Sequence, residues 1–101
     1  MKYRIVLNGA VQGVGCRSLV RSVAKRMNLG GVVRNLDSGE VEVYIEAFGD
    51  KIAEKFVDEV RRAAQNTTID IMNAQIFNED KNEFYSSKPP KDFSEFRIEH
   101  F

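Results

Sequence analysis

Residues 9–17, GAVQGVGCR, combine flexible backbone with a cationic side chain at the predicted start of a helix. Glycine occupies positions 9, 13 and 15, and Arg17 ends the stretch. Glycine lets successive backbone N–H groups point inward, and a helix N-terminus adds unpaired N–H groups and partial positive charge. The guanidinium of Arg17 is a planar fork that suits phosphate oxygens. This pattern predicts an anion site, although a tight strand-to-helix connection would also use these glycines. The residues predicted to bind the anion are Gln12, Gly13, Val14, Gly15, Cys16 and Arg17.

The elements that would position this loop follow from hydrophobic periodicity. Alternating apolar residues predict strands over residues 2–8, 32–36, 40–48, 68–77 and 93–101. Apolar stripes at helical spacing predict two helices, one from Arg17 to the glycines at 30 and 31, and one behind an expected N-cap, Asp50, to about Gln65. The alternation of residues 68–77 changes phase near Met72, which indicates a β-bulge.

The element order is β-α-β-β-α-β with a short extra strand at the end. It predicts an α+β protein, a ferredoxin-like α/β sandwich with a mixed, mostly antiparallel sheet and both helices on one face. The 101 residues are expected to form a single domain. In residues 40–48 we expect Glu42 and Tyr44 to point outward, and Arg34 to face solvent or an acidic partner. Residues 78–92 are polar, include two prolines, and are predicted to be a loop.

Composition limits the function classes. The formal net charge is zero, which gives no global attraction for nucleic acid or for an anionic membrane. A single cysteine and no predicted signal or membrane-spanning segment favour a cytoplasmic location. One histidine and one cysteine offer no metal-ligand cluster with a usable spacing. A monomer is expected, with dimerisation through exposed edge strands left open.

Two motifs carry a resemblance to a known family. Residues 9–49, GAVQGVGCRSLVRSVAKRMNLGGVVRNLDSGEVEVYIEAFG, closely resemble the N-terminal half of the acylphosphatases, whose pattern runs G-x-V-Q-G-V-G-F-R and then L-x-G-W-V-R-N. The ending FRIEHF resembles the closing F-x-I-x-Y of that family, with His100 at the aromatic position. The family is a ferredoxin-like sandwich, in agreement with the element order.

The resemblance implies hydrolysis of acyl phosphates to a carboxylate and inorganic phosphate, without metal or cofactor. Arg17 aligns with the phosphate-binding arginine of the family, and the backbone of residues 12–17 aligns with its phosphate loop. Asn35 aligns with the asparagine that positions the attacking water. The implied partners are a small-molecule acyl phosphate or inorganic phosphate.

Departures from the family pattern keep other functions open. Cys16 replaces a phenylalanine and Val32 replaces a tryptophan, so a domain that binds a phosphorylated ligand without hydrolysing it is one alternative. A cysteine-based phosphatase is a second, because a helix N-terminus can acidify a thiol, although Ser22 occupies the arginine position of the usual C-x5-R motif. An RNA-binding domain is a third, opposed by Glu42 and Glu46 beside Tyr44 and Phe48.

Overall fold

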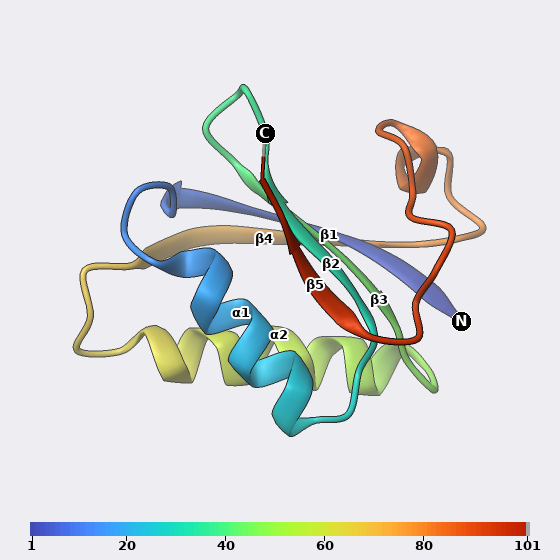
Figure 1. Cartoon of the computed structure of the whole chain (residues 1–101), viewed down its shortest axis with the longest axis horizontal. Coiled ribbons are helices and arrows are strands. Elements are labelled where there is room, and N and C mark those ends of the chain that lie inside the picture. The colour runs from blue at the N-terminus through green and yellow to red at the C-terminus, as the bar shows by residue number, and fades with distance from the viewer. Residues whose placement is uncertain (101) are drawn as a thin grey trace.

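The fold is a five-stranded sheet with two helices packed on one face (Figure 1). The computed structural model describes residues 1–100. Its elements, in chain order, are β1 (Lys2–Ala10), α1 (Cys16–Arg26), β2 (Gly31–Asn35), β3 (Val41–Glu46), α2 (Asp50–Ala64), β4 (Asp70–Asn78), a 3-10 helix (Asn82–Tyr85) and β5 (Phe96–Glu99). The strand order is β4-β1-β3-β2-β5. All pairs are antiparallel except β2 with β5, which is parallel. The predicted ferredoxin-like α+β fold is confirmed.

The core lies between the sheet and the helices. The amphipathic stripes of α1 and α2 meet the inward residues of β1 and β3, because burying these apolar faces against each other removes them from water. Fully buried members of this core include Ile5, Leu7, Val20, Val43, Ile45 and Phe56. No helix among residues 1–100 is long and apolar enough to cross a membrane.

The opposite face of the sheet is covered as well. Glu42 and Tyr44 lie on this face, as the alternation of β3 predicts, but neither side chain reaches solvent. Phe84, from the 3-10 helix, packs on Tyr44 with ring centroids 5.3 Å apart, and the Tyr44 hydroxyl donates to the Phe84 carbonyl. The polar loop predicted over residues 78–92 is therefore a cover that buries this face. Tyr44 is buried while Phe48 is exposed, so the RNA-binding alternative lacks the pair of exposed aromatic side chains that it requires.

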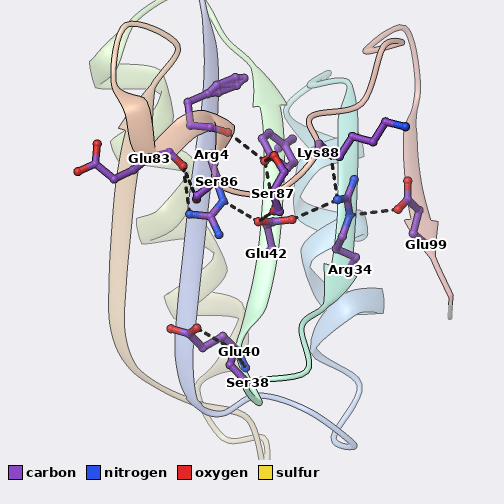
Figure 2. Close-up of polar contacts among 12 residues, drawn as sticks. Arg4, Arg34, Ser38, Glu40, Glu42, Glu83, Ser86, Ser87, Lys88 and Glu99 are labelled. Atoms are coloured by element: carbon purple, nitrogen blue, oxygen red, sulfur yellow. Dashed lines mark hydrogen bonds and ion pairs between the residues drawn. The ribbon is translucent and has the colours of Figure 1, made fainter.

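A buried charge cluster lies under this cover (Figure 2). The Glu42 carboxylate is 2.6 Å from Nε of Arg4 and 3.3 Å from Nη1 of Arg34, and it also accepts from the Ser87 hydroxyl. Arg34 is also paired with Glu99, at 3.0 Å. Sequence analysis left two alternatives for the Arg34 side chain, solvent or an acidic partner. The structure shows the acidic partners, Glu42 and Glu99.

Two local predictions have different outcomes. The bulge near Met72 is confirmed: Asn8 pairs with Asn73 and Gly9 pairs with Ile71, which leaves Met72 as the extra residue. Gly9 has a positive φ of 128°, and a Cβ there would collide with the backbone of β4.

The Asp50 N-cap is wrong. Helix α2 begins at Asp50, the capping position is Gly49, and no side chain caps the helix. Instead, the Asp50 carboxylate accepts a hydrogen bond of 2.8 Å from the Tyr3 hydroxyl. A carboxylate in the first helical turn still interacts favourably with the helix dipole.

Candidate active site

The loop between β1 and α1 brings unpaired backbone donors to the start of a helix. Gly13 and Gly15 have φ values of 75° and 85°, in the left-handed region that favours glycine. Gly15 occupies the capping position of α1, and no side chain caps this helix. Within residues 1–100, the backbone N–H groups of Cys16, Arg17 and Ser18 have no hydrogen-bond acceptor. This helix start can therefore receive an anion through its free N–H groups and its dipole.

A pocket of about 120 Å³ joins this loop to β2 and to the end of β5. Its lining residues are Val11, Gly13, Gly15, Cys16, Arg17, Ser18, Asn35, Ile98 and His100. Arg17 and Asn35, the two side chains that the sequence singled out, thus line the same pocket. Gln12 and Val14 do not line it. A larger cavity of about 580 Å³ between α1 and β5 contains no residue of the loop, so size alone does not identify the site.

The guanidinium of Arg17 contacts the protein through a single nitrogen, Nη1, among residues 1–100. Its Nη1 donates to the carbonyl oxygen of Glu99 at 3.1 Å and lies 3.4 Å from Nδ1 of His100. Within residues 1–100, none of its other N–H groups has a protein acceptor. A guanidinium has five donors in a fixed fork, so Arg17 keeps donors for a ligand while its position is fixed by β5.

Asn35 ends β2 with an unpaired acceptor. Its side-chain Oδ1 is buried, and it has no hydrogen-bond partner among residues 1–100. Leaving a buried carbonyl unpaired costs about 1–3 kcal/mol, and such groups are rare in native structures. An acceptor of this kind, beside a pocket with unpaired donors, is suited to a water molecule.

The side chain of Gln12 has a role that sequence reasoning missed. Its Nε2 donates to the carbonyl oxygens of Leu36 and Glu40, at 2.7 and 2.8 Å. These carbonyls flank the turn between β2 and β3, directly after Asn35. Gln12 therefore fixes the loop relative to the strand that carries Asn35, whereas the sequence assigned it only a backbone contribution.

Comparison with known proteins decides the family. The sequence profile of the family "Acylphosphatase" matches residues 3–98. The chain belongs to the acylphosphatase family. The acylphosphatase of Treponema denticola is 37% identical over 71 residues, which cover 70% of this chain and 74% of that one. The acylphosphatase of Pseudomonas aeruginosa is 40% identical over 67 residues, 64% of this chain and 74% of that one. These relatives support acylphosphatase activity for the chain.

Solved structures agree with this family. The crystal structure of acylphosphatase from Bacillus subtilis superimposes with a TM-score of 0.74 at 27% identity, over 98% of each chain. Full-length HypF, in its phosphate- and nucleotide-bound form, contains a similar region: the match covers 98% of this chain but 12% of that one, with a TM-score of 0.67 and 29% identity.

Cys16 packs as a small apolar residue in this acylphosphatase. It is buried in the main core, and burial raises the pKa of its thiol to about 11. At neutral pH the thiol is protonated, while the nucleophile in cysteine chemistry is the thiolate. The cysteine-based phosphatase alternative therefore loses its support. Cys16 also lines the pocket, as a small residue where the family pattern has a phenylalanine.

His100 is the second residue that sequence reasoning missed. It lines the pocket and lies beside Arg17, yet the sequence noted it only as a departure from the closing aromatic of the acylphosphatases. The available signal was its alternation with Ile98 in the strand predicted over residues 93–101, since Ile98 lines the same pocket. Without the structure, nothing in the sequence shows that the end of β5 lies next to α1. Among residues 1–100 there is no group of three or more His, Cys, Asp or Glu side chains placed to hold a metal ion.

Proposed function

We propose that this acylphosphatase hydrolyses small acyl phosphates by binding the phosphoryl group with loop N–H groups and Arg17 while Asn35 orients the attacking water. One observation carries the proposal. A single pocket gathers unpaired donors, from the start of α1 and from Arg17, and lies beside an unpaired acceptor, Oδ1 of Asn35. Donors suit the phosphoryl oxygens, and the acceptor suits a hydrogen of water.

The chemistry requires positioning more than proton transfer. A carboxylate is a good leaving group, so the reaction needs little help from a general acid. Phosphoryl transfer depends on holding the phosphoryl group, offsetting its charge and placing the nucleophile in line. Asn35 is not a base at neutral pH, but its carbonyl can accept a water hydrogen and so aim the water oxygen. A phosphoryl oxygen of the substrate can take the proton.

The size of the pocket supports a head-group site. About 120 Å³ is small beside the roughly 300–1,000 Å³ of pockets that enclose a drug-sized ligand. The pocket would hold the phosphoryl group and leave the acyl group outside. Recognition would then depend on the part that all acyl phosphates share, which favours activity on several of them.

The test is hydrolysis of benzoyl phosphate by the wild-type chain, by Arg17→Ala and by Arg21→Ala. Arg21 is an exposed arginine on the same helix, one turn beyond Arg17, and does not line the pocket. We expect Arg17→Ala to lower kcat/KM by about 100-fold or more, as for loss of a donor to transition-state charge. Arg21→Ala should stay close to wild type. A wild-type rate equal to spontaneous hydrolysis would contradict the proposal and favour a non-hydrolytic binding domain.

A further inference from the structure

Arg34 directly precedes Asn35 in β2, but its side chain lies on the covered face of the sheet (Figure 2). There it contacts the Glu42 and Glu99 carboxylates at 3.3 and 3.0 Å, and its Nη1 donates to the carbonyl oxygen of Lys88 at 3.1 Å. The two carboxylate contacts are ion pairs without hydrogen-bond alignment. Arg34 therefore joins β3, β5 and the segment that covers the sheet.

Charge balance explains why Arg34 needs Glu99. Arg4 and Arg34 both pair with Glu42, so the buried cluster without Glu99 holds two cations and one anion. A buried charge must be paired, because its removal from water is costly. Glu99 supplies the second anion. Its carboxylate is partly exposed and forms an ion pair with the buried guanidinium of Arg34.

Glu99 also contacts the candidate active site through its main chain. β5 has only four residues, Phe96–Glu99, and pairs with one neighbour, β2, in a register that places Glu99 opposite Arg34. The carbonyl oxygen of Glu99 accepts from Arg17, and the next residue, His100, lies beside the same guanidinium nitrogen. One residue at the end of a short edge strand thus contacts Arg34 through its side chain and Arg17 through its backbone.

We propose that Arg34 is a positioning residue for the reaction: by holding the Glu99 carboxylate it fixes the end of β5, and the Glu99 carbonyl in turn fixes the guanidinium of Arg17. This inference rests on the proposed function of Arg17 and adds a residue that does not touch the substrate. It also gives the buried cluster a role in phosphoryl binding besides its role in the fold.

Arg4 provides a matched control. It pairs with the same Glu42 carboxylate, and its exposed fraction, 9%, is close to the 8% of Arg34. Within residues 1–100 it has no contact with Glu99. Arg4→Gln and Arg34→Gln should therefore disturb the cluster to a similar degree, and only Arg34→Gln should free the end of β5.

The measurements are benzoyl phosphate kinetics and inhibition by inorganic phosphate, under conditions where circular dichroism shows every variant folded. We expect Arg34→Gln to lower kcat/KM by about tenfold or more and to weaken phosphate inhibition, since a misplacement of about 1 Å can cost about 100-fold. Arg4→Gln should stay within about twofold of wild type. Equal effects of the two variants, or no effect of Arg34→Gln, would overturn the proposal.

A double-mutant cycle tests the route through Glu99. Glu99→Gln keeps the backbone carbonyl and removes the charge of the side chain. Because the Glu99 side chain is partly exposed, this variant should fold, and it can test the proposal alone if Arg34→Gln does not fold. If Arg34 acts through Glu99, the double variant should be no less active than Arg34→Gln alone, because coupled residues are not additive. Fully additive losses would contradict that route.

A readout without turnover separates this proposal from the proposed function. The Nη–H resonances of Arg17, observed by ¹⁵N NMR in the free protein, should shift and exchange faster with water in Arg34→Gln than in Arg4→Gln, because Nη1 is the nitrogen that donates to the Glu99 carbonyl. An unchanged Arg17 resonance in Arg34→Gln would reject the positioning role. A wild-type chain without hydrolytic activity would instead reject the proposed function and leave this measurement valid.

Discussion

Two neighbouring residues of β2 use their polar groups in opposite ways. Arg34 contacts two carboxylates and a backbone carbonyl, on the covered face of the sheet. Asn35, one residue later, has a buried side-chain oxygen without any partner among residues 1–100. Polar groups that maintain the fold have ion-pair or hydrogen-bond partners in the protein, whereas groups suited to a ligand have neither. Of these two adjacent residues of β2, Arg34 thus belongs to a structural charge cluster and Asn35 to the candidate binding site.

The same contrast extends to the surroundings of the two residues. The Glu42 carboxylate is bound by Arg4, Arg34 and the Ser87 hydroxyl, with no exposed surface. The start of α1 has three N–H groups without acceptors within residues 1–100, and Arg17 is engaged through one nitrogen. A substitution in the cluster should therefore change stability most, and a substitution in the pocket should change activity most.

The largest expected effect is on stability, from Glu42→Gln. The change leaves Arg4 and Arg34 buried without the carboxylate they share, and breaking a buried pair in this way costs about 3–5 kcal/mol. The free energy of unfolding is measured by urea denaturation. Glu59→Gln is the control, because Glu59 also faces two arginines, Arg26 and Arg62, but at the surface. Exposed ion pairs contribute about 0–1 kcal/mol, so Glu59→Gln should change the free energy of unfolding little. Equal losses of stability in Glu42→Gln and Glu59→Gln would contradict the difference between the buried cluster and a surface pair.

The next effect is on activity, from Asn35→Ala. The substitution removes no hydrogen bond to a described residue, so the free energy of unfolding should change by about 1 kcal/mol or less. Loss of water orientation should lower kcat by about 100-fold, in line with loss of one positioned polar group at a reacting centre. Benzoyl phosphate hydrolysis and urea denaturation are measured on the same sample. A large loss of stability with normal kcat would assign Asn35 to the fold instead.

The smallest effect is expected from Cys16→Ala, which lies at the boundary between core and pocket. Loss of the buried sulfur should cost about 1 kcal/mol, and kcat should stay near wild type because the proposed reaction uses no thiol. A strong loss of kcat in this variant would reopen thiol catalysis.

The pH dependence of Cys16 adds a second check. Burial raises the pKa of its thiol to about 11, above its ordinary value. From about pH 9 the unfolded chain begins to lose this proton while the folded chain keeps it, so the wild-type free energy of unfolding falls as pH rises through that window. Urea denaturation near pH 7 and pH 10 should show a larger fall for wild type than for Cys16→Ala. Equal falls would contradict a thiol held neutral by burial.

The sequence predicted the framework well because local periodicity specifies strands and helices. The phase change near Met72 correctly indicated the bulge, and the stripes of both helices indicated the face that packs on the sheet. Alternation in β3 placed Glu42 and Tyr44 on the second face, but it could not show that residues far along the chain cover that face. The covering segment is polar and has no periodicity, so only the tertiary structure identifies it.

The candidate site was predictable to the extent that motifs mark it. The glycines and Arg17 predicted an anion site from their chemistry, and Asn35 was found through the resemblance. The side-chain role of Gln12 and the position of His100 depend on contacts 24 to 83 positions apart in the sequence. Local patterns contain no information about such contacts.

The hydrogen bond between Arg17 and Glu99 joins residues 82 positions apart. Helix α1 can form within microseconds from local contacts, but this contact requires a long loop to close and an edge strand to dock. Recovery of turnover during refolding therefore reports on the docking of β5 beside the loop, whereas circular dichroism averages over the whole chain.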